Sequence, residues 1–111
     1  MTNWPIGDNG ASSGSGAASI PNVYRSTMLA SEDFTSLTGD NAGGDHLIAI
    51  LTPIGLARNF NPNGTFLDGY TVYLINLGAF NVIFDSAGIA LTIPVGMQGK
   101  AIIDNIAATW R

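Results

Sequence analysis

The sequence predicts an all-β fold, a small antiparallel β-sandwich or jelly roll, on three observations. From residue 20 onward, short runs rich in Val, Ile, Phe, Tyr and Thr are separated by Gly, Asn, Asp and Pro. Apolar side chains alternate along Tyr70–Asn76, which is typical of a strand. No window keeps a 3.6-residue apolar period for three turns without Gly or Pro. The 111 residues suit one domain.

Residues 1–21 are predicted to form an extended N-terminal arm ahead of a β-sandwich domain over residues 22–111. Gly, Ser and Ala dominate residues 8–18 (DNGASSGSGAA), and such a stretch loses much backbone entropy on ordering while burying little surface. Trp4, Pro5 and Ile6 form an apolar segment ahead of this tether. We expect the arm to be flexible in isolation and to dock Trp4 on a neighbouring subunit.

Eight strands are predicted in the domain, separated by residues that suit turns. Asn63-Gly64 fits the positive φ of a tight hairpin, and Pro94 ends its strand because it has no N–H for the ladder. A short helix around Ser26–Asp33 is the one helical alternative, and Ser31 could instead cap a single turn there. No internal repeat of the solenoid kind is found. The predicted strands are 33–37, 46–51, 56–60, 70–76, 81–85, 89–93, 100–104 and 107–110.

Charged side chains are scarce, and this scarcity narrows the function classes. Asp, Glu, Lys and Arg make up 11% of the residues, against about 25% in ordinary soluble domains. Pro, Gly or Asn interrupts each long apolar run, so no membrane-spanning helix is expected. The basic residues are scattered and form no patch for nucleic acid. The remaining explanation is a surface largely covered by protein partners, whose interfaces are depleted in charge.

Candidate chemistry is sparse, and we expect no enzyme, no cofactor and no metal. Cysteine is absent, which removes disulfides and thiolate metal sites. His46 is the single histidine, and strand alternation is expected to turn Asp45 away from it, which argues against a Ser–His–Asp triad. Residues 40–45 are rich in oxygen ligands and leave calcium open as an alternative, without the spacing of an EF-hand. The aromatic residues leave a sugar-stacking surface open.

The stretch Gly69–Arg111 carries an ordered set of turn and strand residues. A strand ends in Asn, a Gly follows, and then come a Val/Ile strand, a Gly loop, an Ile-Pro-x-Gly turn, a strand ending in Asp and a closing Trp. These positions are Asn76, Gly78, Val82–Phe84, Gly88, Ile93-Pro94-Val95-Gly96, Asp104 and Trp110. This order resembles modules of bacteriophage virion proteins, namely tail fibres, head fibres and capsid decoration proteins. The resemblance implies a β-sandwich or jelly-roll module, often trimeric, with a structural or attachment role.

The resulting functional expectation is a non-enzymatic virion structural protein that decorates or cements a phage capsid. It would act through homo-oligomeric contacts, a trimer being favoured, and through an N-terminal arm that reaches the major capsid protein or other virion subunits. The alternative is a phage fibre or receptor-binding module that contacts host surface glycans, and a small hydrolase is a third class. The expected location is the virion, on the capsid surface or a fibre. The residues expected to contact partners are Trp4, Ile6, Tyr24, Arg25 and Trp110.

Overall fold

The computed structural model describes residues 22–40, 44–86, 89–105 and 109–110, and it confirms the all-β prediction. Within these residues there are nine strands in two sheets, no helix, and hence no helix long and apolar enough to cross a membrane. The predicted arm, residues 1–21, lies outside the described residues. The strands are β1 (Val23–Met28), β2 (Glu32–Phe34), β3 (His46–Pro53), β4 (Arg58–Pro62), β5 (Thr71–Asn76), β6 (Val82–Ser86), β7 (Ile89–Ile93), β8 (Gln98–Asp104) and β9 (Thr109–Trp110).

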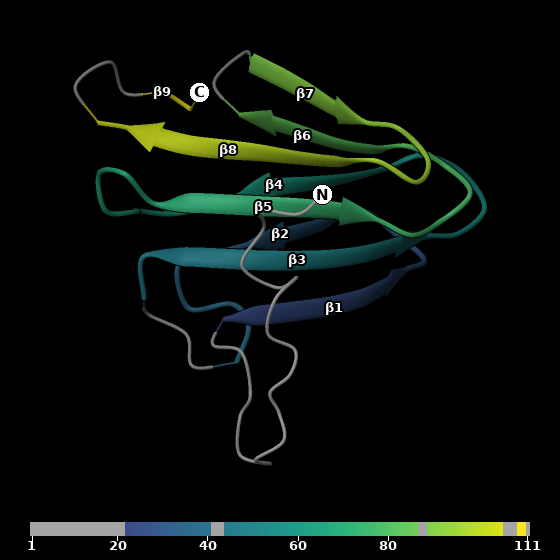
Figure 1. Cartoon of the computed structure of the whole chain (residues 1–111), viewed down its shortest axis with the longest axis horizontal. Coiled ribbons are helices and arrows are strands. Elements are labelled where there is room, and N and C mark those ends of the chain that lie inside the picture. Colours follow the sequence, from purple (N-terminus) through teal and green to yellow (C-terminus); the bar gives the residue numbers. More distant parts are fainter. Residues whose placement is uncertain (1–21, 41–43, 87–88, 106–108, 111) are drawn as a thin grey trace.

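The chain crosses between the two sheets after each of its first five strands (Figure 1). One sheet has the order β1-β3-β5-β8-β9 and the other has the order β2-β4-β6-β7. Strands β1, β3 and β5 are therefore parallel neighbours, and so are β2, β4 and β6. We call each pair of successive strands, one in each sheet, a coil: β1–β2, β3–β4 and β5–β6.

The prediction of an antiparallel fold is wrong for the pairings between these coils, which are parallel. Antiparallel pairs are confined to the second half, where β7 turns back beside β6, β8 runs beside β5, and β9 follows β8. The physical reason lies in the loops. Gly64 has the expected positive φ of 104°, but its loop carries the chain from β4 in one sheet to β5 in the other, so no hairpin forms.

A constant register links the coils in the first sheet. Val23 lies opposite Ile48 and Ile48 opposite Tyr73, so equivalent positions are 25 residues apart. The second sheet does not keep this spacing, since Glu32 lies opposite Phe60 and Arg58 opposite Val82. No sequence repeat accompanies the register of the first sheet, because the aligned side chains differ in kind, as in the row Ser26, Leu51 and Asn76.

The two sheets share one apolar core. Alternate residues of β5, Val72 and Leu74, point into it, as the alternation in this run predicts. The opposite sheet contributes Phe34 and Phe60, whose rings stack with centroids 4.6 Å apart. Trp110 packs edge-on against the aromatic cluster and is 4% exposed. A core rich in aromatic rings supplies a large share of the apolar burial that holds so small a domain together.

The first coil was the least well predicted element, because no helical turn forms around Ser26–Asp33. Ser26 belongs to β1 and Glu32 to β2. The Ser31 hydroxyl caps no helix and instead accepts a hydrogen bond from the backbone N–H of Asn59 at 2.9 Å. A tertiary contact between the β1–β2 loop and strand β4 has replaced the expected local one.

A carboxylate clamp joins the two edge strands β1 and β2. The Tyr24 hydroxyl donates to Glu32 Oε1 at 2.6 Å, and the Ser26 hydroxyl donates to Glu32 Oε2 at 2.6 Å. The Tyr24 ring also stacks on Phe60, with centroids 5.8 Å apart. Burial raises the pKa of Tyr24 above 10.0, and the hydrogen bond to Glu32 raises it further. Both effects favour the neutral phenol next to the carboxylate.

The raised pKa of Tyr24 predicts that the folded protein loses stability at high pH. Because its pKa is raised in the folded state, its contribution is complete below pH 10 and is lost as the pH rises through the folded pKa. Urea unfolding at pH 8 and pH 11 should show a smaller decline for Tyr24→Phe than for the wild type. The decline in stability that remains in the variant comes from Tyr70, because burial raises the pKa of that phenol as well. At pH 8 the variant should lose about 1 kcal/mol through the missing hydrogen bond. An equal decline in both proteins would contradict the assignment.

Candidate functional site

All loops that follow an odd-numbered strand meet at one end of the molecule, on the right in Figure 1. Strands β1, β3 and β5 end there and β8 begins there, so the loops 29–31, 54–57, 77–81 and 94–97 are neighbours. We call these four loops the apolar end. Their sequences are LAS, IGLA, LGAFN and PVGM, and none contains Asp, Glu, Lys or Arg.

The apolar end exposes large apolar side chains at a density unusual for a surface. Of the ten large hydrophobic residues that are exposed in the described part of the chain, seven lie here. They are Leu29 (70% exposed), Ile54 (41%), Leu56 (57%), Leu77 (62%), Phe80 (38%), Val95 (51%) and Met97 (55%). Scattered apolar residues on a surface need no explanation, whereas a contiguous group marks an interaction site.

Backbone hydrogen bonds tie these loops to their neighbours. Ile54 N–H donates to the Met28 carbonyl at 3.0 Å, and Leu77 N–H donates to the Leu51 carbonyl at 2.8 Å. Asn76 N–H donates to the Met97 carbonyl at 3.0 Å, which links the third coil to the start of β8. The apolar side chains therefore project from a backbone that is already fixed, so a partner need not order it on binding.

A buried amide organises the centre of the apolar end. The Asn76 side chain is 1% exposed, and its Nδ2 donates to the carbonyls of Phe80 at 2.7 Å and Ile93 at 2.9 Å. Its Oδ1 accepts from the Gly78 N–H at 2.9 Å. One side chain thus joins the β5–β6 loop to the end of β7, using both amide protons and the carbonyl.

Gly78 meets a steric requirement in the same loop. A Cβ at this position would lie 2.7 Å from the backbone N and 2.7 Å from the backbone O of Pro53. Backbone atoms cannot move aside as the tip of a side chain can, so only glycine lets the third coil approach the second this closely. Asn76 and Gly78 both belong to the order of residues on which the resemblance to virion proteins rests.

The opposite end of the molecule has the reverse character. Its loops and strand ends carry five of the eight acidic residues. These are Asp40, Asp45, Asp68, Asp85 and Asp104. We call this the acidic end. Charge and apolar surface are therefore separated along the strand direction. The charged residues nearest to the apolar end lie in the strands. Arg58, the first residue of β4, is one of them, and its guanidinium donates to the Ile54 carbonyl.

The predicted contact residues do not gather in one place. Trp4 and Ile6 lie outside the described residues. Tyr24 and Arg25 are neighbours in β1, with Tyr24 held against the core and Arg25 on the outward face. Trp110, at 4% exposure, lies in the core, where it contacts other rings of the same chain.

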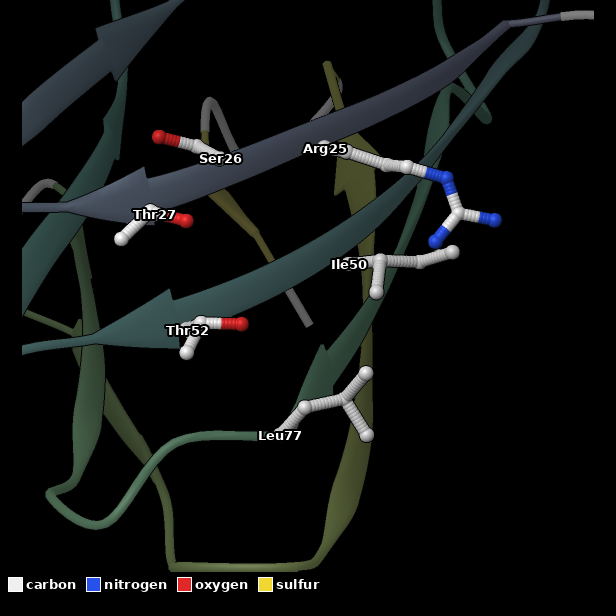
Figure 2. Close-up of a pocket in the computed structure, with 6 residues that line it drawn as sticks. All are labelled: Arg25, Ser26, Thr27, Ile50, Thr52 and Leu77. Carbon is white, nitrogen blue, oxygen red and sulfur yellow. The ribbon is translucent and has the colours of Figure 1, made fainter.

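Arg25 lines a depression of about 260 Å³ on the outward face of β1 and β3 (Figure 2). Its guanidinium group extends over Ile50, and two threonines on neighbouring strands face the same space. The lining residues are Arg25, Ser26, Thr27, Ile50, Thr52 and Leu77. They include no carboxylate and no imidazole, so acid–base chemistry has no pair of groups here.

Asp45 and His46 are in contact, contrary to the expectation from strand alternation. Asp45 Oδ1 lies 2.9 Å from His46 Nδ1. Asp45 precedes β3, so the alternation of side chains along a strand does not apply to it. The hydrogen bond to His46 holds the pKa of Asp45 below its usual range. In the described part of the chain no serine hydroxyl bonds to His46, and no three His, Asp or Glu residues group as metal ligands.

Two buried polar atoms near the acidic end have no hydrogen-bond partner among the described residues, Asn22 Oδ1 and the Tyr70 hydroxyl. Burial raises the pKa of Tyr70, and the charge of Asp45 raises it further, so the phenol stays neutral. Part of the oxygen-rich segment considered for calcium, residues 41–43, lies outside the described residues.

Comparison of the chain with family models, curated proteins and solved structures gives no match in any of the three. The apolar end is therefore assigned from its geometry alone. Sequence reasoning missed it because the four loops are far apart in the chain. The sequence does carry one signal, which is that all four loops lack charged residues. That the four loops lie together follows only from the order of the strands, which places alternate loops at opposite ends of the molecule.

Replacing the buried amide should loosen the apolar end. In Asn76→Leu, two carbonyls and one N–H lose their partners while the number and branching of the side-chain heavy atoms are kept, so we expect a loss of about 2–4 kcal/mol in the free energy of unfolding. Urea denaturation followed by circular dichroism measures it. Asn81→Ala, an exposed position in the same loop, is the control and should change stability by less than about 0.5 kcal/mol. Equal effects of the two changes would show that the amide network is unimportant.

Proposed function

We propose that this chain is a non-enzymatic virion structural protein that decorates or cements a phage capsid. The observation that supports the proposal is the apolar end, where seven exposed large side chains project from four loops without a single charge. A surface of this kind is suited to adhesion rather than to catalysis, because it offers area and shape but no ionisable acid or base.

The resemblance to virion proteins gains support from the place of its residues in the fold. Asn76 and Gly78 shape the β5–β6 loop, and Pro94 and Val95 lie in the loop between β7 and β8. Of these residues, Val95 is itself exposed on the adhesive surface, while Asn76 and Gly78 shape one of its loops. A shared order of turns would then reflect a shared way of presenting loops to a neighbour.

The proposal assigns different contacts to different parts of the chain. The apolar end makes the contacts between subunits of the homo-oligomer. The segment 1–21 makes the contact with the shell through Trp4 and Ile6. It joins the described fold at Asn22, at the acidic end, and 21 residues span up to about 70 Å when extended. Once one of two linked contacts has formed, the effective concentration of the second binding segment near its site is high, which slows release of the subunit.

The alternative, glycan binding by a fibre module, needs aromatic rings on the surface. Most of the described rings are in the core, and Phe80 is the only exposed aromatic residue among the described positions. A single ring within an apolar loop does not form the stacking platform that saccharide recognition uses. The decoration function is therefore the better supported of the two.

Sedimentation with capsids tests the proposal. The purified chain should co-sediment in a saturable way with shells of the virus that encodes it. The double change Trp4→Ser, Ile6→Ser in the full chain should weaken this binding by about tenfold or more, because buried apolar anchors dominate binding energy. Leu37→Ser, a 72% exposed position in the β2–β3 loop, is the control and should bind as the wild type does. No binding to shells, together with binding on a glycan array, would contradict the proposal and favour the fibre alternative.

A further inference from the structure

We infer that the apolar end binds the apolar end of a second copy of this chain, so that two copies meet end to end about a twofold axis. The inference rests on the proposed function, since it names the partner that occupies the surface assigned there to contacts between subunits. It is carried by three observations on the described residues: the distribution of charge, the exposed apolar area and the fixed loop backbone.

The charge distribution favours pairing of like ends. Two apolar ends facing each other bring together eight loops that contain no ionisable side chain, and the Arg58 guanidinium, which reaches this end, keeps its hydrogen bonds to the Ile54 carbonyl. A head-to-tail contact would instead press Asp40, Asp45 and Asp68 against uncharged loops. End-to-end pairing also keeps the two acidic ends apart by at least two strand lengths, about 40 Å, which is several Debye lengths at physiological ionic strength.

The exposed area matches what a stable pair needs. If about 150 Å² is taken for each large residue, the low end of the range for aromatic side chains, the seven residues expose roughly 550 Å² of surface. A standard interface buries about 800 Å² on each partner, of which about 56–65% is apolar, or roughly 450–520 Å². The apolar end therefore supplies about the whole apolar part of one such interface without help from the rest of the surface.

The topology identifies the centre of the contact. Strands β3 and β5 lie inside their sheet, between β1 and β8, so the β3–β4 and β5–β6 loops are central and the other two flank them. Leu56, Leu77 and Phe80 lie in these central loops. Binding energy concentrates near the middle of an interface, where side chains lose all contact with water. The buried Asn76 amide holds this centre in place before the second copy arrives.

Mass measurement of the full chain tests the pairing. Analytical ultracentrifugation at micromolar concentration should give twice the chain mass of 11.5 kDa. The double change Leu56→Gln, Leu77→Gln should raise the dimer dissociation constant by roughly 100-fold, with an unchanged circular dichroism spectrum. The matched control is Leu37→Gln, Leu67→Gln, whose residues are 72% and 63% exposed but lie at the other end, and it should leave the dimer intact. A monomer at all concentrations would overturn the inference.

Spin labels distinguish the end-to-end arrangement from other oligomers. Since the chain has no cysteine, a single one introduced as Val95→Cys or as Asn63→Cys carries one label for each copy. Electron–electron distance measurements should give a short separation at position 95 and a much longer one at position 63. A trimer, or a short distance at position 63, would overturn the pairing. Shell binding that persists in that case would leave the proposed function standing, whereas loss of both would remove it as well.

Discussion

The fold depends on one constraint, which is that each of the first five strands is followed by a strand in the opposite sheet. Successive strands run in opposite directions along the same axis, so the loops fall alternately at one end and at the other. The reversal at β7 changes the pairing from parallel to antiparallel but keeps this alternation. A linear sequence in which alternate loops differ in polarity therefore becomes a molecule with two unlike ends. The separation of the apolar loops from the acidic ones follows from this connectivity.

The buried amide of Asn76 has an unusual position in this arrangement. It lies in a row with Ser26 and Leu51. At this position the first coil has a serine hydroxyl that bonds Glu32, and the second coil has an apolar leucine. A polar group at this depth is favourable only because each of its hydrogen-bonding atoms is satisfied. In return it holds the β5–β6 loop against the end of β7. The uncharged surface keeps its shape through hydrogen bonds made beneath it.

Sequence reasoning located most of the elements and few of their partners. Alternation and turn residues placed eight of the nine strands, and β7 was predicted with its observed bounds, Ile89–Ile93. The strand β1 was missed because Ser26 points inward, where it bonds a carboxylate instead of adding to an apolar pattern. Parallel pairing was missed because Gly64 has the same positive φ in a crossing loop as in a hairpin. The contact between Asp45 and His46 depends on the loop before β3, where no periodicity applies. The apolar end needs the order of strands, which no single stretch of sequence contains.

The hydrogen bonds of Tyr24 and Ser26 to Glu32 affect whether a further strand can pair with the edge of this molecule. A stack of parallel coils has no intrinsic last member, because an open edge strand can pair with the next chain as readily as with its own neighbour. At the β1–β2 side of this molecule the Glu32 carboxylate lies between the two edge strands, where an incoming coil would have to bury its charge. Growth by the addition of strands is therefore disfavoured at that side.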